Sequence, residues 1–148
     1  MFRFKAGRIE VLLGRQGGPY YENMTEGHWS IPKGLRDGEE PVKNCAIREF
    51  REETGFEPTD EGSWIYLGIV RSKSAKVYVI WAFEGDCNPQ EFQSNTCSIE
   101  WPKGSGEKIE IPEIDKMDFF GIEEAKQKIV LSQQPFIDRL KTKLKEKK

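Results

Sequence analysis

A short segment, residues 41–56, constrains this chain more than any other part of its sequence. The proline that opens it suits the first turn of a helix, because its φ is already helical and no hydrogen-bond donor is lost there. Val42, Ala46 and Phe50 recur at intervals of four residues and form an apolar stripe. Gly55 readily adopts the left-handed backbone conformation with which many α-helices end. The segment therefore predicts one amphipathic helix with a defined beginning and end.

Short apolar segments with strand-like composition flank this helix. The strands are expected at residues 1–4, 8–13, 29–31, 64–71, 76–84, 96–101, 108–111 and 118–120, and further helices at 122–131 and 136–147, separated by Pro135. The 148 residues contain no repeat and no low-complexity linker. We therefore expect a single α/β domain over residues 1–148.

Three glutamates of the predicted helix share one face. Glu49, Glu52 and Glu53 fall within an arc of about 100° on an ideal helix. Such carboxylates repel one another unless a cation lies between them. Magnesium prefers oxygen ligands, bridges phosphate oxygens and lowers the pKa of an attacking water. Arg48 lies four residues before Glu52, close enough to hold its carboxylate. Taken alone, this face is also typical of a solvated, charged helix.

The pattern extends beyond the glutamates. Residues 34–56 match Gly-x5-Glu-x7-Arg-Glu-U-x-Glu-Glu-x-Gly-U, where U is a bulky apolar residue, at all nine specified positions. The chain thus resembles the Nudix hydrolases. It is most similar to a bacterial group regarded as NTP pyrophosphohydrolases, which shares the segments 29–34, 94–96, 100–102 and 133–140. The resemblance implies an α/β/α sandwich with a mixed sheet between helices.

The resemblance also carries roles onto individual residues. Glu49 is implied to be either the third metal ligand or the base that activates water, since Nudix families differ here. The residues implied to hold Mg²⁺, for which Mn²⁺ could substitute, are Gly34 through its carbonyl, Glu52 and Glu53. Those implied to orient the catalytic helix are Arg48 and Glu40. Many Nudix enzymes recruit one more glutamate beyond the box. Glu113, or else Glu110, is expected to fill this role if it is not simply an exposed loop carboxylate.

Lys33 lies immediately before the box and bears on the substrate. The run Trp-x-x-Pro-Lys-Gly at residues 29–34 resembles diadenosine-polyphosphate hydrolases and diphosphoinositol phosphatases, whereas MutT-like enzymes more often have glycine at this lysine position. A lysine beside a metal site binds an extra phosphate as a point charge, although it could also be an ordinary surface lysine. The sequence therefore favours dinucleoside polyphosphates, with diadenosine tetraphosphate yielding ATP and AMP.

Other activities remain open. The main alternative is an NTP or 8-oxo-dNTP pyrophosphohydrolase, followed by hydrolysis of ADP-ribose or of 5′-triphosphate RNA. A nucleotide-sensing module without catalysis is a further alternative, but such a module is expected to lose box carboxylates that this sequence retains. Tyr20, Tyr21 and Trp81 could stack on a nucleobase, an interaction of about 1–3 kcal/mol. Trp81 lies in a strong strand, so core packing is its competing explanation.

Charge and cysteine content limit the partners. The 23 basic and 25 acidic side chains give a net charge of −2, so nucleic acid is not an expected partner. Cys45, Cys87 and Cys97 show no metal-ligand spacing and are expected to be reduced thiols. No apolar run approaches the ~20 residues of a membrane helix, and no signal peptide is visible. We expect a cytoplasmic protein with a small nucleotide as partner and a short first strand beginning at Met1; the oligomeric state is left open.

Overall fold

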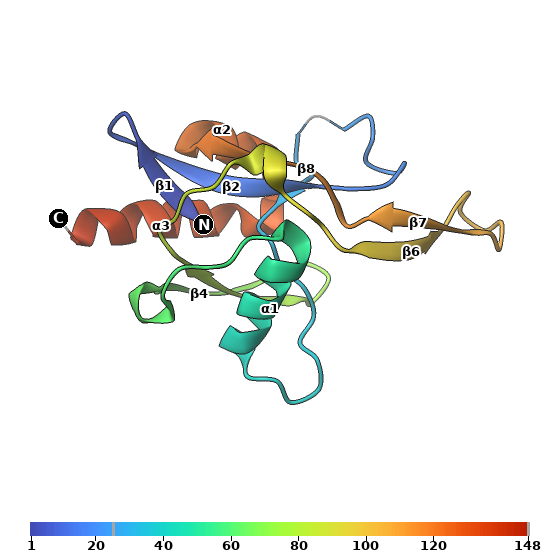
Figure 1. Ribbon diagram of the computed structural model, residues 1–148, viewed down its shortest axis with the longest axis horizontal. Helices are drawn as coiled ribbons and strands as arrows, with labels where there is room; N and C mark the ends of the chain where they lie inside the picture. The colour runs from blue at the N-terminus through green and yellow to red at the C-terminus, as the bar shows by residue number, and fades with distance from the viewer. Residues whose placement is uncertain (25, 148) are drawn as a thin grey trace.

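The computed structural model describes residues 1–24 and 26–147, whose arrangement is shown in Figure 1. A four-stranded antiparallel sheet lies at its centre. Strand β2 (Arg8–Gln16) pairs with β8 (Ile114–Gly121) along one edge. Along the other edge it pairs with β1 (Phe2–Lys5) and β3 (Trp29–Ser30). The turn between β1 and β2 is where the sequence predicts it.

Two antiparallel hairpins form separate two-stranded sheets beside the central one. The first consists of β4 (Ile65–Arg71) and β5 (Val77–Ala82), and the second of β6 (Thr96–Glu100) and β7 (Lys108–Pro112). The β6–β7 hairpin projects from the body of the molecule as an arm (Figure 1). In the described part of the chain, parallel pairing is confined to the isolated bridges Phe2–Glu84 and Trp29–Ile129.

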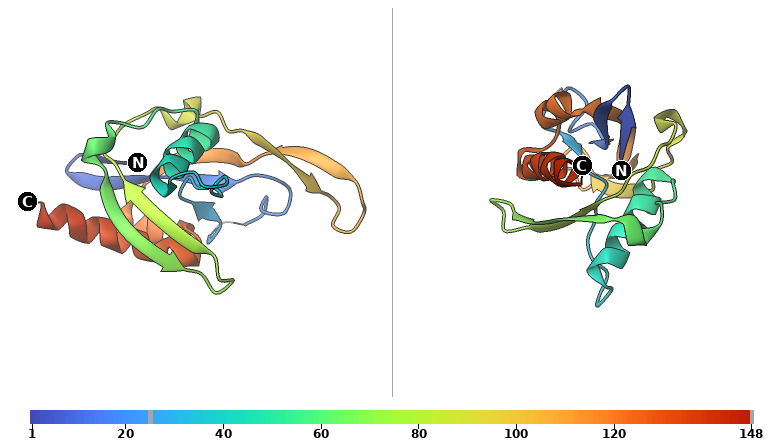
Figure 2. Two further views of the ribbon diagram at one scale, coloured as in Figure 1. Left: turned by 90° about the horizontal axis from the view of Figure 1, so that it is seen from below. Right: turned by 90° about the vertical axis from the view of Figure 1, so that its left-hand side faces the viewer.

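Helices cover both faces of the central sheet, and β2 shows why. Alternate side chains of a strand point to opposite faces. Val11 and Leu13 pack in one core cluster with Phe136, whereas Leu12 packs in a second cluster with Phe50. Phe136 belongs to α3 (Gln134–Glu146), which lies beside α2 (Ile122–Lys128), and Phe50 belongs to α1 (Val42–Thr54). Figure 2 shows α3 and α1 on opposite sides, so the expected α/β/α sandwich is confirmed.

Helix α1 ends at Gly55 as predicted, whereas Pro41 is its N-cap residue instead of lying in the first turn, and other boundaries also differ. Gly55 has φ 75° and donates its N–H to the carbonyl of Arg51 at 2.8 Å, which ends α1. Strand β8 is longer than the expected residues 118–120, because its backbone pairs with β2 along almost its whole length. Pro135 lies in the first turn of α3 instead of separating two helices. Short 3-10 turns complete the chain at Glu61–Ser63, Pro89–Glu91 and Leu131–Gln133.

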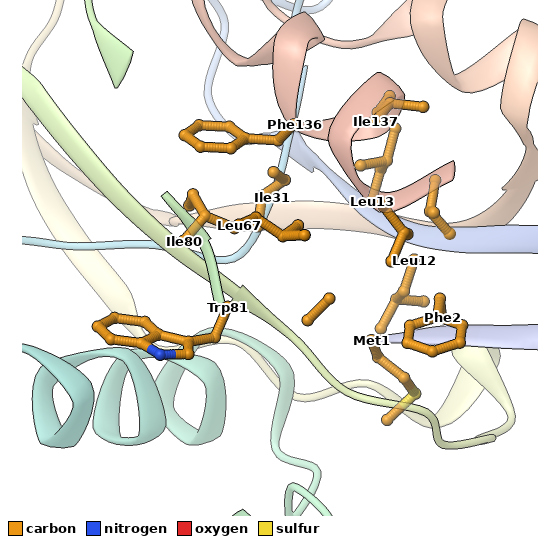
Figure 3. A pocket seen from close by; sticks show the side chains of 13 residues that line it. Met1, Phe2, Leu12, Leu13, Ile31, Leu67, Ile80, Trp81, Phe136 and Ile137 are labelled. Carbon is orange, nitrogen blue, oxygen red and sulfur yellow. The ribbon is translucent and has the colours of Figure 1, made fainter. Parts of the chain in front are cut away.

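A small apolar cavity of about 40 Å³ lies between β2, β5 and α3 (Figure 3). Ile80 and Leu67 point towards Phe136 of α3, whereas Trp81, the next residue of β5, points towards α1. The β4–β5 hairpin thus has two apolar faces, one for each helical layer. No helix within the described residues is long and apolar enough to cross a membrane.

Candidate active site

The carboxylates of α1 lie beneath the loop that precedes the helix. Glu49 is 8% exposed and Glu53 only 1%, whereas the side chain of Glu52 is 42% exposed. Glu49 and Glu53 are one helical turn apart and therefore face the same way, towards residues 32–34. Carboxylates are seldom buried without a partner. Their surroundings therefore decide what this part of the molecule does.

Arg48 holds the outer carboxylates in place. Its Nη1 donates to Oε1 of Glu49 at 2.8 Å and to Oε2 of Glu52 at 3.1 Å. The Nε and Nη2 atoms donate to the two oxygens of Glu40 at 2.9 and 3.0 Å, and Nη2 also donates to the carbonyl of Leu35 at 3.0 Å. These bonds lower the pKa of the Glu40 carboxyl to about 2. The contact of Arg48 with Glu52 is the one that their spacing predicts, and the guanidinium fork also ties the preceding loop to α1.

Gly34 leaves room for the carboxylate of Glu49. A Cβ atom at position 34 would lie 1.9 Å from Cδ of Glu49 and 2.1 and 2.2 Å from its oxygens. No side chain can therefore be placed at position 34 unless Glu49 moves. The glycine of the pattern is thus explained by close approach of a carboxylate to the backbone.

Lys33 contacts the deeply buried carboxylate twice. Its backbone N–H donates to Oε2 of Glu53 at 2.9 Å, and its Nζ lies 3.8 Å from Oε1. The Lys33 side chain is 31% exposed, so the ammonium also reaches the surface. A cation in this position can bind a solvent-accessible anion beside the carboxylates.

Glu113 joins the cluster from the junction of β7 and β8. Burial raises the pKa of Glu49 and Glu53, and the nearby Glu113 carboxyl raises both further; the pKa of Glu53 reaches about 8. A side-chain hydrogen bond between Glu53 and Glu113 contributes to this increase in the pKa of Glu53. Glu110 is exposed on β7. The structure therefore places Glu113 beside the box carboxylates, as the sequence favours.

Backbone hydrogen bonds explain how a residue sixty positions away reaches α1. The N–H of Asn95 donates to the carbonyl of Glu52 at 2.9 Å, so the start of β6 is attached to the end of α1. The N–H of Glu113 then donates to the carbonyl of Asn95 at 3.0 Å, and its own carbonyl accepts from Gly17 at 2.9 Å. Glu113 is thus held from both sides.

The donor set suits a hard divalent cation. The buried Glu49 and Glu53 lie on one face of α1 with Glu113 nearby, and Arg48 is already divided among Glu40, Glu49 and Glu52. Such an excess of negative charge requires protons or a metal. Within the described residues, no three His, Cys, Asp or Glu side chains converge as a ready-made metal site. In this arrangement Glu49 and Glu52 accept hydrogen bonds from Arg48, and Glu53 accepts one from Lys33.

The two candidate stacking tyrosines lie in the loop between β2 and β3. Tyr20 is 68% exposed, and its ring packs edge-on against Tyr21 with centroids 5.2 Å apart. For the described residues, no hydrogen bond or ring contact joins either tyrosine to the carboxylate cluster. The structure therefore brings Lys33 to the cluster but not the tyrosines.

Gln133 is a supporting residue that the sequence pattern does not reveal. Its side chain is 1% exposed, and its Oε1 accepts the N–H of Ile31 at 2.9 Å while Nε2 donates to Oγ of Ser30 at 3.3 Å. These bonds fix the strand that leads into Lys33 and Gly34. Gln133 begins the shared segment 133–140, but its role depends on burial, which is not visible in a single sequence.

Comparison with known proteins identifies the family. The family model for the NUDIX domain matches residues 1–140. No curated protein matches the chain by sequence. A solved structure of a C. elegans Ap4A hydrolase binary complex is similar over 98% of this chain and 94% of its own, with 20% identity and a TM-score of 0.65.

Two further solved structures share the fold. The NUDIX domain of Shewanella oneidensis NrtR, complexed with ADP ribose, has 16% identity and a TM-score of 0.63, covering 97% of this chain and 82% of its own. A mutT/nudix family protein from Listeria innocua has 17% identity and a TM-score of 0.61, covering 99% and 90%. Nudix enzymes generally use divalent metal ions, which agrees with the donor set. The chain therefore belongs to the Nudix family and is a hydrolase that acts on phosphoanhydrides.

Proposed function

We propose that this protein is a magnesium-dependent hydrolase of nucleoside diphosphate-linked substrates, with dinucleoside polyphosphates, diadenosine tetraphosphate first, as its preferred class. One observation carries the proposal: the Lys33 ammonium lies 3.8 Å from Oε1 of Glu53, at the rim of a buried carboxylate cluster. A substrate with several phosphates can occupy the cluster and the lysine together. A point charge at the rim therefore favours a long phosphate chain.

The carboxylates divide the work. Glu52, Glu53 and Glu113, with the carbonyl of Gly34, would hold Mg²⁺, for which Mn²⁺ could substitute. When bound, such an ion would supply charge neutralisation at phosphate oxygens and a more acidic water. Lys33 binds the phosphate chain.

Glu49 is the candidate base. Its Oε1 accepts from Arg48 at 2.8 Å, which leaves Oε2 to take a proton from the attacking water. Burial raises the pKa of this carboxyl, which makes it a stronger base. If Glu49 is instead the third metal ligand, Glu49→Gln should weaken magnesium activation; if it is the base, kcat should fall even at saturating magnesium.

Two further proposals concern base stacking by exposed tyrosines and the location of the protein in the cell. Tyr20 and Tyr21 offer aromatic faces that could stack on a base, as the sequence suggests. Cys45, Cys87 and Cys97 are free thiols, which fits a reducing cytoplasm. We accordingly propose a single cytoplasmic domain whose partner is a small nucleotide.

Product analysis tests the reaction. Wild-type protein with magnesium and diadenosine tetraphosphate should consume one water and release ATP and AMP, and EDTA should stop it. Glu53→Gln should lose activity by orders of magnitude while remaining folded. Glu57→Gln is the matched control, because Glu57 is exposed and pairs with Arg51, away from the cluster.

Other outcomes would redirect the assignment. Release of pyrophosphate from NTPs or 8-oxo-dGTP, without turnover of any dinucleoside polyphosphate, would contradict the substrate class. Preference for ADP-ribose or 5′-triphosphate RNA would do the same. Full activity of Glu53→Gln would contradict the metal site, and nucleotide binding without any turnover would indicate a sensing module.

A further inference from the structure

A second pocket lies on the other side of the loop that covers the carboxylates. Its volume is about 380 Å³, and it is bounded by that loop, by the first half of α1 and by the β4–β5 hairpin. Ligand pockets span about 300–1,000 Å³. The catalytic roles proposed above make no use of this space, although it is large enough for part of a nucleotide.

Aromatic rings line the wall of the pocket formed by the hairpin. Trp81 is half-buried and points towards α1 (Figure 3). Its ring also contacts that of Tyr66 on β4, with centroids 5.5 Å apart. Trp64 lines the same pocket and is held parallel to Phe83, with centroids 5.0 Å apart and an interplanar angle of 15°. Flat indole faces supported from behind are suited to stacking on a nucleobase.

The opposite wall explains why the space exists. Small side chains, Cys45 and Ala46, face the hairpin from α1. At the rim, Val42 is 39% and Val77 48% exposed. A closed core would bury such residues, so α1 and the hairpin stand apart and leave the pocket open to solvent.

Cations connect this pocket to the carboxylate cluster. Lys33 and Arg36 both line the pocket, and Lys33 is the residue whose Nζ approaches Glu53 at 3.8 Å. The pocket and the cluster therefore share one wall, residues 33–36. A phosphate chain bound at Lys33 would lead from the carboxylates directly to the aromatic rings.

We propose that this pocket binds the second nucleoside of a dinucleoside polyphosphate, the one remote from the cleaved bond, with its base stacked on Trp81. The inference rests on the proposed function and deepens it, because it explains how a substrate with two nucleosides is preferred. A mononucleoside polyphosphate has one base and therefore cannot fill this pocket and the site of the first nucleoside at the same time.

Binding separates the two substrate types. In a Glu52→Gln background with magnesium, where turnover is slow, titration calorimetry should give a Kd for diadenosine tetraphosphate at least tenfold below that for adenosine 5′-tetraphosphate. Adding Trp81→Leu should reduce this difference to less than threefold. Ile69→Ala is the matched control, since Ile69 is 49% exposed on the same hairpin and does not line the pocket; it should leave the ratio unchanged.

A second variant guards against a folding artefact. Ala46→Leu fills the pocket from the α1 side without removing an aromatic ring, and it should abolish the difference as Trp81→Leu does. Thermal unfolding of each variant checks that the fold persists. Equal affinities in the parental background, a ratio that survives both variants, or no binding of either nucleotide would each overturn the proposal.

The experiments also distinguish an incorrect reaction from an incorrect pocket assignment. If wild-type protein hydrolyses no dinucleoside polyphosphate but the affinity difference exists and both variants remove it, the reaction is wrong and the pocket assignment stands. If diadenosine tetraphosphate is hydrolysed but bound no better than adenosine 5′-tetraphosphate, the function stands and the pocket assignment is wrong.

Discussion

The Cδ atom of Glu49 lies 1.9 Å from the position that a Cβ atom on Gly34 would occupy. The carboxylate therefore packs directly against the backbone of the preceding loop. Lys33 and Gly34 cover Glu53 and Glu49 respectively, so a two-residue segment positions both buried carboxylates. This contact makes position 34 a sensitive test of the candidate site.

Gly34→Ala should disable catalysis without unfolding the protein. The added methyl group must push the Glu49 carboxylate away by more than an ångström, and a misplacement of about 1 Å can cost roughly 100-fold in rate. We expect kcat to fall at least about 100-fold, measured by product release under saturating magnesium. Gly121→Ala is the control, because a Cβ there meets nothing within 4 Å. Equal kcat values for the two variants would contradict the role of this contact.

Glu53→Gln should change how stability depends on pH in metal-free protein. The unfolded carboxyl ionises near its ordinary pKa of 4.5, whereas the folded one, raised mainly by burial, keeps its proton to about 8. Between these values the folded state binds the extra proton, so wild-type stability should fall as pH rises, by up to about 1.4 kcal/mol per unit. The variant should lack this decline.

Urea unfolding at pH 5, 7 and 9 in EDTA measures this effect. The difference in unfolding free energy between Glu53→Gln and wild type should grow from pH 5 to pH 8 and then level off. Glu57→Gln, an exposed neighbour, should follow wild type. Parallel curves for Glu53→Gln and wild type would show that the buried carboxyl does not retain its proton.

Arg48→Lys should impair activity although it keeps the charge. Arg48 donates to Glu40, Glu49 and Glu52 at once, and an ammonium group cannot reproduce this planar fork. We expect kcat/KM to fall about 10- to 100-fold. Arg51→Lys lies on the same helix, where Arg51 makes one exposed pair with Glu57, and it should retain activity. Comparable losses in both variants would indicate a general effect on the helix instead.

Gln133→Ala should destabilise the protein. Removing the side chain leaves the N–H of Ile31 without its acceptor, and a buried unsatisfied donor costs about 1–3 kcal/mol. The loss should appear in urea unfolding, and kcat should also decrease because Ile31 leads into Lys33. Gln90→Ala, at an exposed position in a 3-10 turn, should change neither quantity.

The sequence predicts the catalytic helix well because its signals are local. The helix boundaries depend on Pro41 and Gly55, and the pairing of Arg48 with Glu52 depends on one turn of helix. The four strands of the two hairpins after the helix are also predicted, from their composition, although their pairing is not. The fold class follows from this order of elements.

Other features depend on contacts between distant residues. The first half of strand β8 is defined by its pairing with β2. The sequence does not predict it because Asp115 and Lys116 are polar and interrupt the apolar pattern of a strand. The choice between Glu113 and Glu110 depends on hydrogen bonds of Asn95 that connect β6 to α1. Such placements follow from the register of the assembled sheets, which no short window contains.

Arg139 of α3 donates from Nη1 to the carbonyls of Leu67 at 3.0 Å and Ile69 at 3.1 Å, beside the irregularity in strand pairing between Tyr66 and Gly68. The C-terminal helix thus fastens the β4–β5 hairpin, while the catalytic loop is fastened separately by Arg48. Weakening the Arg139 attachment would therefore act first on the hairpin that carries Trp81, whereas weakening the Arg48 attachment would act first on the loop that covers the carboxylates.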